Sequence, residues 1–197
     1  MMPILILAAG ASSRMRGADK LLEQIDGIPL LRHQTEIALR VSDDVRVALP
    51  PRPHARYAAL DDLPVRMVEV TDAAEGMNAS LRTVFGTLEP DIPHAMLLLA
   101  DLPDITQDDL NRMKTGVAEH PDALIWRGTT EDGRGGHPMV FDAALFAEFS
   151  HLTGDAGGQS VVKAAGSRVH HVPLPGNRAR RDLDTPEDWA AWRAAQT

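Results

Sequence analysis

The sequence predicts a three-layer α/β fold, in which helices cover both faces of a mostly parallel sheet. Short apolar runs alternate with amphipathic stretches along the chain, which is the pattern of strand–helix units on a parallel sheet. Two runs, at residues 4–7 and 95–100, are apolar without alternation, as expected of central strands that are buried on both faces. The 197 residues contain no linker or internal repeat, so we expect one domain over residues 1–197.

The first half of the chain supplies the other elements on one side of the predicted sheet. Strands are predicted at 45–49, which ends at two consecutive prolines, and at 65–70. Helices are predicted at 29–41 and 77–88, where apolar residues recur at helical spacing. In the second helix the residues expected to face inward are Met77, Leu81, Val84, Phe85 and Leu88.

The second half begins with a helix after Thr106, which forms a capping box with Asp109. Strands are predicted at 123–126, 139–141 and 169–172, and short helices at 143–152 and 159–165. A last helix follows Thr185, with Pro186 at its first position and acidic residues in its first turn. These elements complete the alternation of strands and helices.

Composition and charge exclude several classes of partner. There are 20 Lys and Arg against 28 Asp and Glu, which gives a net charge of −8 and disfavours nucleic-acid strands and acidic membranes. No cysteine is present, so disulfides, thiolate metal sites and a cysteine nucleophile are excluded. No apolar run approaches the roughly 20 residues of a membrane span. We therefore expect a soluble, cytoplasmic protein.

The loop after the first strand, residues 8–20, has the composition of an anion-binding loop. Small residues around Gly10 let the backbone approach a ligand closely, and Arg14, Arg16 and Lys20 add positive charge. The glycine spacing fits neither a dinucleotide-binding fingerprint nor a P-loop. A phosphate site at the carboxyl end of the first strand is the interpretation we favour, and an exposed loop with incidental charges is the alternative.

Five segments stand out along the chain, in this order: the loop from Leu7 to Lys20, Glu75 to Arg82, Leu99 to Pro103, Gly136 to Phe141, and Asp182 to Asp188. Together they resemble nucleotidyltransferases typified by the molybdenum cofactor cytidylyl- and guanylyltransferases. A single segment would be a weak indication, but five in the same order are specific. The resemblance implies a Rossmann-like nucleotidyltransferase fold.

The resemblance also implies a reaction, in which a substrate phosphate attacks the α-phosphorus of a nucleoside triphosphate and pyrophosphate leaves. This chemistry depends on positioning and on neutralisation of charge. Arg14 and Lys20 are expected to hold the triphosphate. The alternative for Lys20 is a solvated position on the surface. Arg16 is expected to be exposed. The segment expected to lie against the nucleotide consists of Leu7, Ala8, Ala9 and Gly10.

Carboxylates at two places are candidate ligands for Mg²⁺. Asp101 follows the most apolar strand of the chain, where a carboxylate is costly to bury without a partner. We expect it to bind Mg²⁺, an ion that takes oxygen ligands, and the alternative is a turn residue before Pro103. Asp182 and Asp184 compete for a second metal contact, but both could equally form a turn and cap the helix at Pro186.

Three further residues each have a functional and a structural interpretation. Gly76 and Ser80 lie at the start of a predicted helix, where they either contact the base or ribose or simply begin the helix. His137 either contacts the acceptor substrate or has a structural role beside Pro138.

The nucleotide is expected to be CTP. Ala9 and the segments 75–81 and 182–188 resemble the cytidylyl branch, whereas the spacing from Arg14 to Lys20 resembles the guanylyl branch. The resemblance implies molybdopterin bearing molybdenum as acceptor, with an apo-molybdoenzyme or its chaperone as a further partner. The alternatives are GMP transfer from GTP, transfer to another acceptor phosphate, and a non-catalytic cofactor-binding carrier.

Overall fold

The computed structural model describes residues 1–154 and 157–196 and contains one large sheet of seven strands. The strand order is β5-β4-β1-β6-β8-β7-β9, and β8 alone runs antiparallel to its neighbours in this sheet. The predicted three-layer α/β fold with a mostly parallel sheet is confirmed. The strands are β1 (Ile4–Leu7), β4 (Val45–Leu49), β5 (Arg66–Glu69), β6 (His94–Leu99), β7 (Ile125–Thr129), β8 (Gly135–Asp142) and β9 (Val169–Pro173).

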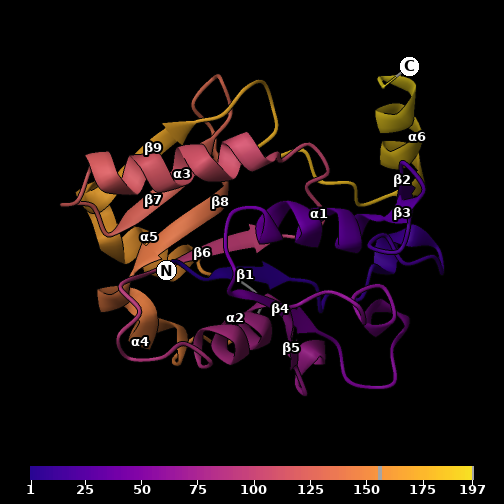
Figure 1. Cartoon of the computed structure of the whole chain (residues 1–197), viewed down its shortest axis with the longest axis horizontal. Helices are drawn as coiled ribbons and strands as arrows, with labels where there is room; N and C mark the ends of the chain where they lie inside the picture. Colours follow the sequence, from indigo (N-terminus) through magenta and orange to yellow (C-terminus); the bar gives the residue numbers. More distant parts are fainter. Residues whose placement is uncertain (155–156, 197) are drawn as a thin grey trace.

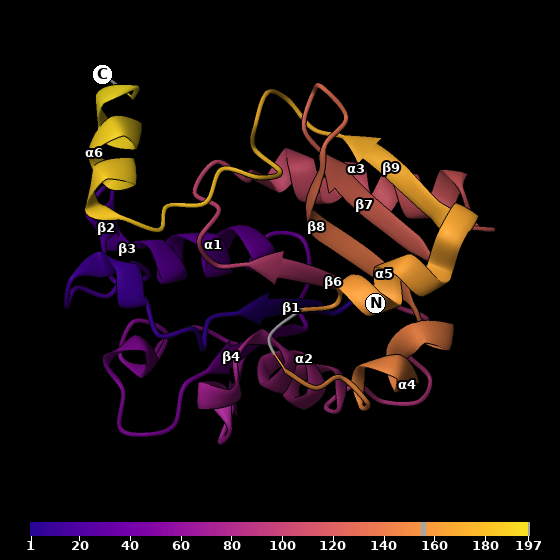
Figure 2. The ribbon, with the colours of Figure 1, turned by 180° about the vertical axis from the view of Figure 1, so that it is seen from behind.

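Helices cover both faces of the sheet. Helices α1 (Leu30–Leu39) and α3 (Gln107–Glu119) lie on one face, and α2 (Met77–Phe85), α4 (Phe146–Phe149) and α5 (Gln159–Ala165) lie on the other (Figures 1 and 2). The last helix, α6 (Pro186–Ala194), stands beside a small two-stranded sheet of β2 (Gln24–Ile25) and β3 (Ile28–Pro29). The C-terminal segment thus returns to the region just after β1.

The two runs predicted as central strands lie side by side at the centre of the sheet. Strand β1 pairs with β4 on one side and with β6 on the other, all in parallel. Side chains of β1 alternate between two buried clusters, with Ile4 and Ile6 under α1 and Leu5 under α2. Burial on both faces explains why these runs show no polar alternation. The carboxyl ends of β1 and β6 therefore meet at one edge of the sheet.

One predicted inward position is wrong. Met77 is 41% exposed, whereas Leu81, Val84 and Phe85 are buried as expected. Met77 is the first residue of α2, where no preceding helical turn lies beneath the side chain. The helix also ends at Phe85, earlier than predicted, and Gly86 caps it. The exposed methionine lies beside the candidate site described below.

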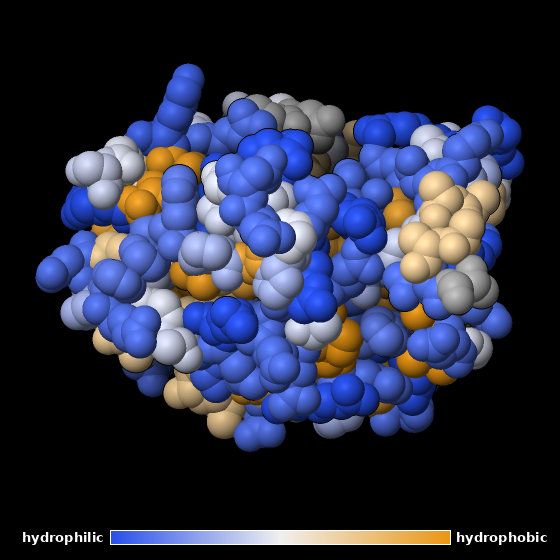
Figure 3. Space-filling view, turned by 90° about the horizontal axis from the view of Figure 1, so that it is seen from above, coloured by the Kyte–Doolittle hydropathy of each residue, from blue (hydrophilic) through white to orange (hydrophobic). Residues whose placement is uncertain are grey.

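The surface carries mostly polar side chains. The face seen from above is hydrophilic over most of its area, with hydrophobic residues visible only between hydrophilic ones (Figure 3). Within the described ranges, no helix combines the length and apolar character that a membrane crossing requires.

Candidate active site

A cavity of about 400 Å³ opens at the carboxyl ends of β1 and β6. Its lining brings together the loop after β1, the start of α2 and two separate carboxylates. The predicted nucleotide-binding residues all line it, as do four of the predicted charged residues, whereas Asp182 and His137 do not. The predicted residues in the lining are Leu7, Ala8, Ala9, Gly10, Arg14, Lys20, Gly76, Ser80, Asp101 and Asp184.

A buried arginine holds the loop after β1 through hydrogen bonds. Arg56 is 1% exposed, and its guanidinium donates two hydrogen bonds to Asp19, at 2.8 and 2.7 Å. It also donates to the carbonyl oxygen of Ala8 at 2.7 Å and to Oγ of Ser12 at 3.0 Å. These contacts join both ends of the loop to one rigid group, so the backbone that lines the cavity is held in place.

Asp19 is a carboxylate that stays charged in this environment. Burial alone would raise the pKa of Asp19, but hydrogen bonds and the positive charge of Arg56 lower it overall, helped by the backbone N–H of Leu21 and by Ser12. The pair is therefore a buried ion pair with most of its donors and acceptors satisfied. Such pairs are costly to break because the remaining charge has no partner.

Glycine is needed where α2 begins. Gly76 has a φ of 103° and a ψ of −161°, a conformation that L side chains rarely adopt. Gly10 differs, because a Cβ there would meet nothing within 4 Å. The fold does not require glycine at position 10, and its effect is to leave space in the cavity. Ser80, buried on the first turns of α2, lines the same cavity.

Lys20 lies between two carboxylates from distant parts of the chain. Its Nζ is 2.5 Å from Oδ2 of Asp101 and 2.6 Å from Oδ1 of Asp184. Burial would lower the pKa of Lys20, but the two carboxylates raise it overall, Asp101 more than Asp184. Lys20 is therefore a cation at neutral pH. The exposed Arg14 also pairs with Asp184, and Arg16 is exposed as expected and pairs with Glu187.

Three carboxylates gather at this edge. Asp101, Asp182 and Asp184 each offer an oxygen within 4.8 Å of the other two. Oδ1 of Asp101 is buried and has no hydrogen-bond partner in the part of the chain that the structure describes. Burial, together with the charges of Asp184 and Asp101, raises the pKa of Asp182. An unpartnered oxygen among three carboxylates is a donor set that suits a hard divalent cation such as Mg²⁺.

The segment that carries Asp184 is positioned by a helix cap. Thr185 is the N-cap of α6 and forms a capping box with Asp188. Neither Asp182 nor Asp184 is the N-cap of this helix, so the capping part of that alternative is wrong. The backbone N–H of Leu183 donates to the carbonyl of Asp101 at 3.3 Å, which holds the segment against the end of β6. The carboxylate of Asp184 thereby remains available to Lys20 and Arg14.

His137 lies elsewhere, on β8, and lines a second cavity. Burial, with a smaller contribution from the charge of Arg127, lowers the pKa of His137 to about 4. The imidazole is therefore neutral at physiological pH. Its Nδ1 is buried without a hydrogen-bond partner in the described ranges.

Sequence reasoning missed the support of the loop. Arg56 lies in a proline-rich segment with two exposed prolines, where an arginine is expected at the surface. Nothing within that segment indicates that the side chain reaches back to Asp19 and Ser12, 37 and 44 residues earlier. The three basic residues of the β1 loop are visible in the sequence, but nothing in the sequence indicates that Arg56 supports the loop.

Residues 4–171 match the family described as the MobA-like NTP transferase domain. The chain belongs to this family. It is 28% identical over 191 residues to a probable molybdenum cofactor guanylyltransferase of Synechococcus elongatus, covering 94% of this chain and 95% of that protein. It is 30% identical to a molybdenum cofactor guanylyltransferase of Ralstonia nicotianae, over 72% of this chain and 71% of that protein.

Solved structures agree with this membership. Rv0371c from Mycobacterium tuberculosis superposes with a TM-score of 0.83 at 25% identity, over 100% of this chain and 98% of that one. A structure of Rv0371c in complex with manganese gives a TM-score of 0.79 at 26% identity, over 96% of both chains. A CMP-2-keto-3-deoxy-manno-octonic acid synthetase in complex with CTP, 18% identical with a TM-score of 0.78, shares the fold. It covers 100% of this chain and 98% of that one. As a MobA-like NTP transferase, the chain is a nucleotidyltransferase.

Proposed function

We propose that this MobA-like NTP transferase transfers GMP from GTP to a phosphate of the molybdenum cofactor and releases pyrophosphate. One observation carries the chemistry: the cationic loop after β1 and the carboxylates of Asp101 and Asp184 line the same cavity. The acceptor and the base are taken from the relatives that are named molybdenum cofactor guanylyltransferases.

The side chains of this cavity fit the demands of nucleotidyl transfer. The loop backbone, fixed by Arg56, lies against the nucleotide, and Ser80 faces the same space. Lys20 and Arg14 balance the charge of the triphosphate and of the departing pyrophosphate. When the nucleotide is absent, both cations pair with Asp184. Binding therefore exchanges carboxylate contacts for phosphate contacts without placing an unpaired cation in the cavity.

Mg²⁺ would be held by Asp101 and Asp184, with Asp182 as a third candidate. Bound there, the ion would neutralise phosphate oxygens and withdraw charge from the α-phosphorus. Asp101 brings a buried, unpartnered oxygen to this position, and Asp184 is held by the cap of α6. The manganese complex of Rv0371c adds support for a divalent cation on this fold.

We take guanine in place of the expected cytosine because the relatives are named guanylyltransferases. Two segments that resemble the cytidylyl branch also make structural contacts: Glu75 pairs with Arg82 at 2.5 Å, and Asp188 completes the capping box of α6. Ala9, the third such feature, belongs to the buried core and also lines the cavity. Arg14 and Lys20, whose spacing resembles that of the guanylyl branch, both line the cavity.

A panel of nucleotides tests this proposal. Pyrophosphate release is measured with Mg²⁺, molybdenum cofactor and GTP, CTP, ATP or UTP in turn. We expect GTP to give at least tenfold higher kcat/KM than CTP, a difference of about 1.4 kcal/mol in transition-state binding. Equal or reversed preference would restore the cytidylyl assignment. No pyrophosphate release with any nucleotide would leave the chain as a binding protein.

A further inference from the structure

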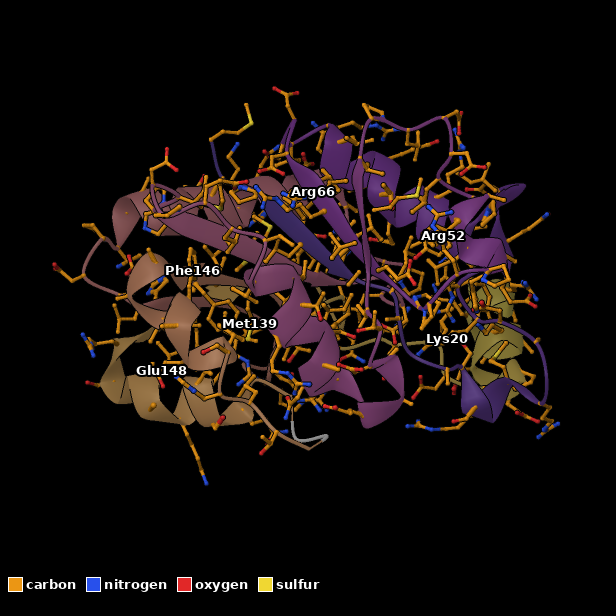
Figure 4. All side chains as sticks on the ribbon, turned by 90° about the horizontal axis from the view of Figure 1, so that it is seen from below. Lys20, Arg52, Arg66, Met139, Phe146 and Glu148 are labelled. Carbon is orange, nitrogen blue, oxygen red and sulfur yellow. The ribbon has the colours of Figure 1, made fainter. Side chains whose placement is uncertain are left out.

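A second cavity, of about 790 Å³, adjoins the first. Met77 lines both cavities at the start of α2. Seen from below, Lys20 of the first cavity and Met139 of the second lie on either side of α2 (Figure 4). The second cavity has apolar walls, formed by Leu81 of α2, Leu97 of β6 and Met139 of β8. It is therefore a space for a second ligand beside the nucleotide.

The titratable residues that the structure describes in the lining of this second cavity are all basic. Among its described lining residues the titratable ones are Arg127, His137 and Lys163, and none is acidic. This is unexpected in a chain with a net charge of −8. A cavity with cations and no carboxylate in its described lining favours an anionic ligand.

Arg127 is the central group of this set. Its Nε donates to the carbonyl of Gly136 at 3.4 Å, and its two Nη groups have no protein partner in the described ranges. A Cβ on Gly135 would lie 2.6 Å from the guanidinium carbon, so glycine leaves the space that this group occupies. Burial and the charge of Arg180 lower the pKa of Arg127, which indicates an arginine held without a compensating carboxylate.

His137 lines the second cavity and lies near Asp101 of the first cavity. Its buried Nδ1 lacks a hydrogen-bond partner in the described part of the chain. The imidazole is close enough to both Arg127 and Asp101 for each charge to act on its pKa. Because Met77 lines both cavities, a ligand in the second cavity would lie beside the nucleotide site.

We propose that Arg127, with Lys163 and His137, binds the phosphate of the acceptor substrate in this second cavity. The inference rests on the proposed function. An arginine holds two oxygens of a phosphate through its parallel N–H groups, which leaves the third oxygen free to react. That oxygen forms a bond to the α-phosphorus of GTP. The bond from the α-phosphorus to the bridging oxygen breaks, and its electron pair leaves with pyrophosphate.

A binding experiment tests the site without turnover. The first cavity is saturated with Mg²⁺ and a GTP analogue that has a methylene between its α- and β-phosphorus atoms, and inorganic phosphate is then titrated. We expect phosphate to raise the Tm of the wild type and of Arg134→Gln, but not of Arg127→Gln. Arg134 is a matched control because it is exposed, lies in the same hairpin and pairs with Asp132.

A kinetic experiment tests the same site in the reaction. With molybdenum cofactor as acceptor, we expect Arg127→Gln to raise the KM for the acceptor at least tenfold and to leave the KM for GTP within twofold. Arg127→Lys should recover part of the loss, since it restores the charge without the bidentate geometry. A purely structural role for Arg127 would instead raise both KM values together.

The outcomes separate the two claims. Phosphate binding that depends on Arg127, in a chain that transfers no nucleotide, would support the anion site and overturn the proposed function. Nucleotide transfer with an unchanged acceptor KM in Arg127→Gln would support the function and overturn the anion site. If phosphate still raises the Tm of Arg127→Gln, that result would also overturn the anion site.

Discussion

Lys20 shows at the scale of one residue how this site is prepared for an anionic ligand. Its ammonium group touches two carboxylates, and these hold it as a cation although its side chain is only 15% exposed. The phosphates of a nucleotide are alternative partners for Lys20, and a divalent cation is an alternative partner for Asp101 and Asp184. Binding nucleotide and metal together therefore keeps the charges balanced.

Asp101→Asn separates charge from size at this position. Asparagine keeps one oxygen and the volume but lacks the negative charge, so we expect turnover to fall by at least about 10²–10³ with little change in Tm. Pyrophosphate release at saturating GTP and acceptor measures the loss. Asp122→Asn, at an exposed position far along the chain, is the control and should remain near wild type. Nearly normal turnover in Asp101→Asn would move the metal to Asp182 and Asp184.

At the scale of elements, the loop after β1 and the start of α6 hold the charged groups. The loop depends on the buried pair of Arg56 and Asp19, and α6 depends on the capping box of Thr185. Both supports lie outside the cavity lining. Changes in either one should therefore affect the site through its geometry.

Arg56→Met tests the support of the loop. The substitution leaves the Asp19 carboxylate partly buried without its partner, so we expect the free energy of unfolding to drop by roughly 3–5 kcal/mol. We also expect the KM for GTP to rise, because the carbonyl of Ala8 loses its donor. Urea unfolding and steady-state kinetics measure both effects. Arg52→Met removes a stacking contact on Tyr57 in the same segment, and we expect a loss of about 1 kcal/mol. Equal losses in the two variants would contradict this account.

Two identical caps offer a matched pair of variants. Thr185→Ala and Thr106→Ala each remove the hydroxyl of a capping box, and each should lower the free energy of unfolding by about 1 kcal/mol. Only Thr185→Ala should weaken the dependence of turnover on Mg²⁺, because Asp184 precedes that cap. Mg²⁺ titrations of pyrophosphate release compare them. If both variants changed the Mg²⁺ dependence alike, the cap of α6 would have no part in placing Asp184.

At the scale of the whole molecule, His137 makes the free energy of unfolding depend on pH. The unfolded chain binds a proton at this residue below about pH 6.5, whereas the folded protein does so only near pH 4. The unfolded state thus binds more protons between these values, and folding stability falls as pH falls through this range. His137 lies near Arg127, which opposes its protonation, and near Asp101, which favours it.

The His137→Gln variant removes this contribution. The free energy of unfolding of the wild type, relative to that of the variant, should be about 3 kcal/mol lower at pH 4 than at pH 6.5. Urea unfolding at a series of pH values measures it, and the exposed His151→Gln serves as control. A difference that does not vary with pH would mean that His137 takes up its proton in the folded protein as readily as in the unfolded chain.

Sequence patterns predict local order well and long-range contacts poorly. The apolar runs of β1 and β6 and the two capping threonines are visible because their causes lie within a few neighbouring residues. The β1 loop and Asp101 are recognisable because parallel strands bring their carboxyl ends to one edge. Arg56 and Arg127 are not, because their partners and surroundings come from segments that only the fold brings together.

The central claim is that an α-phosphoryl nucleotide group passes to the acceptor. The most direct measurement uses GTP labelled with ³²P at either the α- or the γ-phosphorus, with Mg²⁺ and molybdenum cofactor, followed by separation of the products. We expect the α-label on the acceptor and the γ-label in pyrophosphate, since the bond that breaks lies between the α-phosphorus and the bridging oxygen. The γ-label on the acceptor, or no label on it at all, would contradict the account.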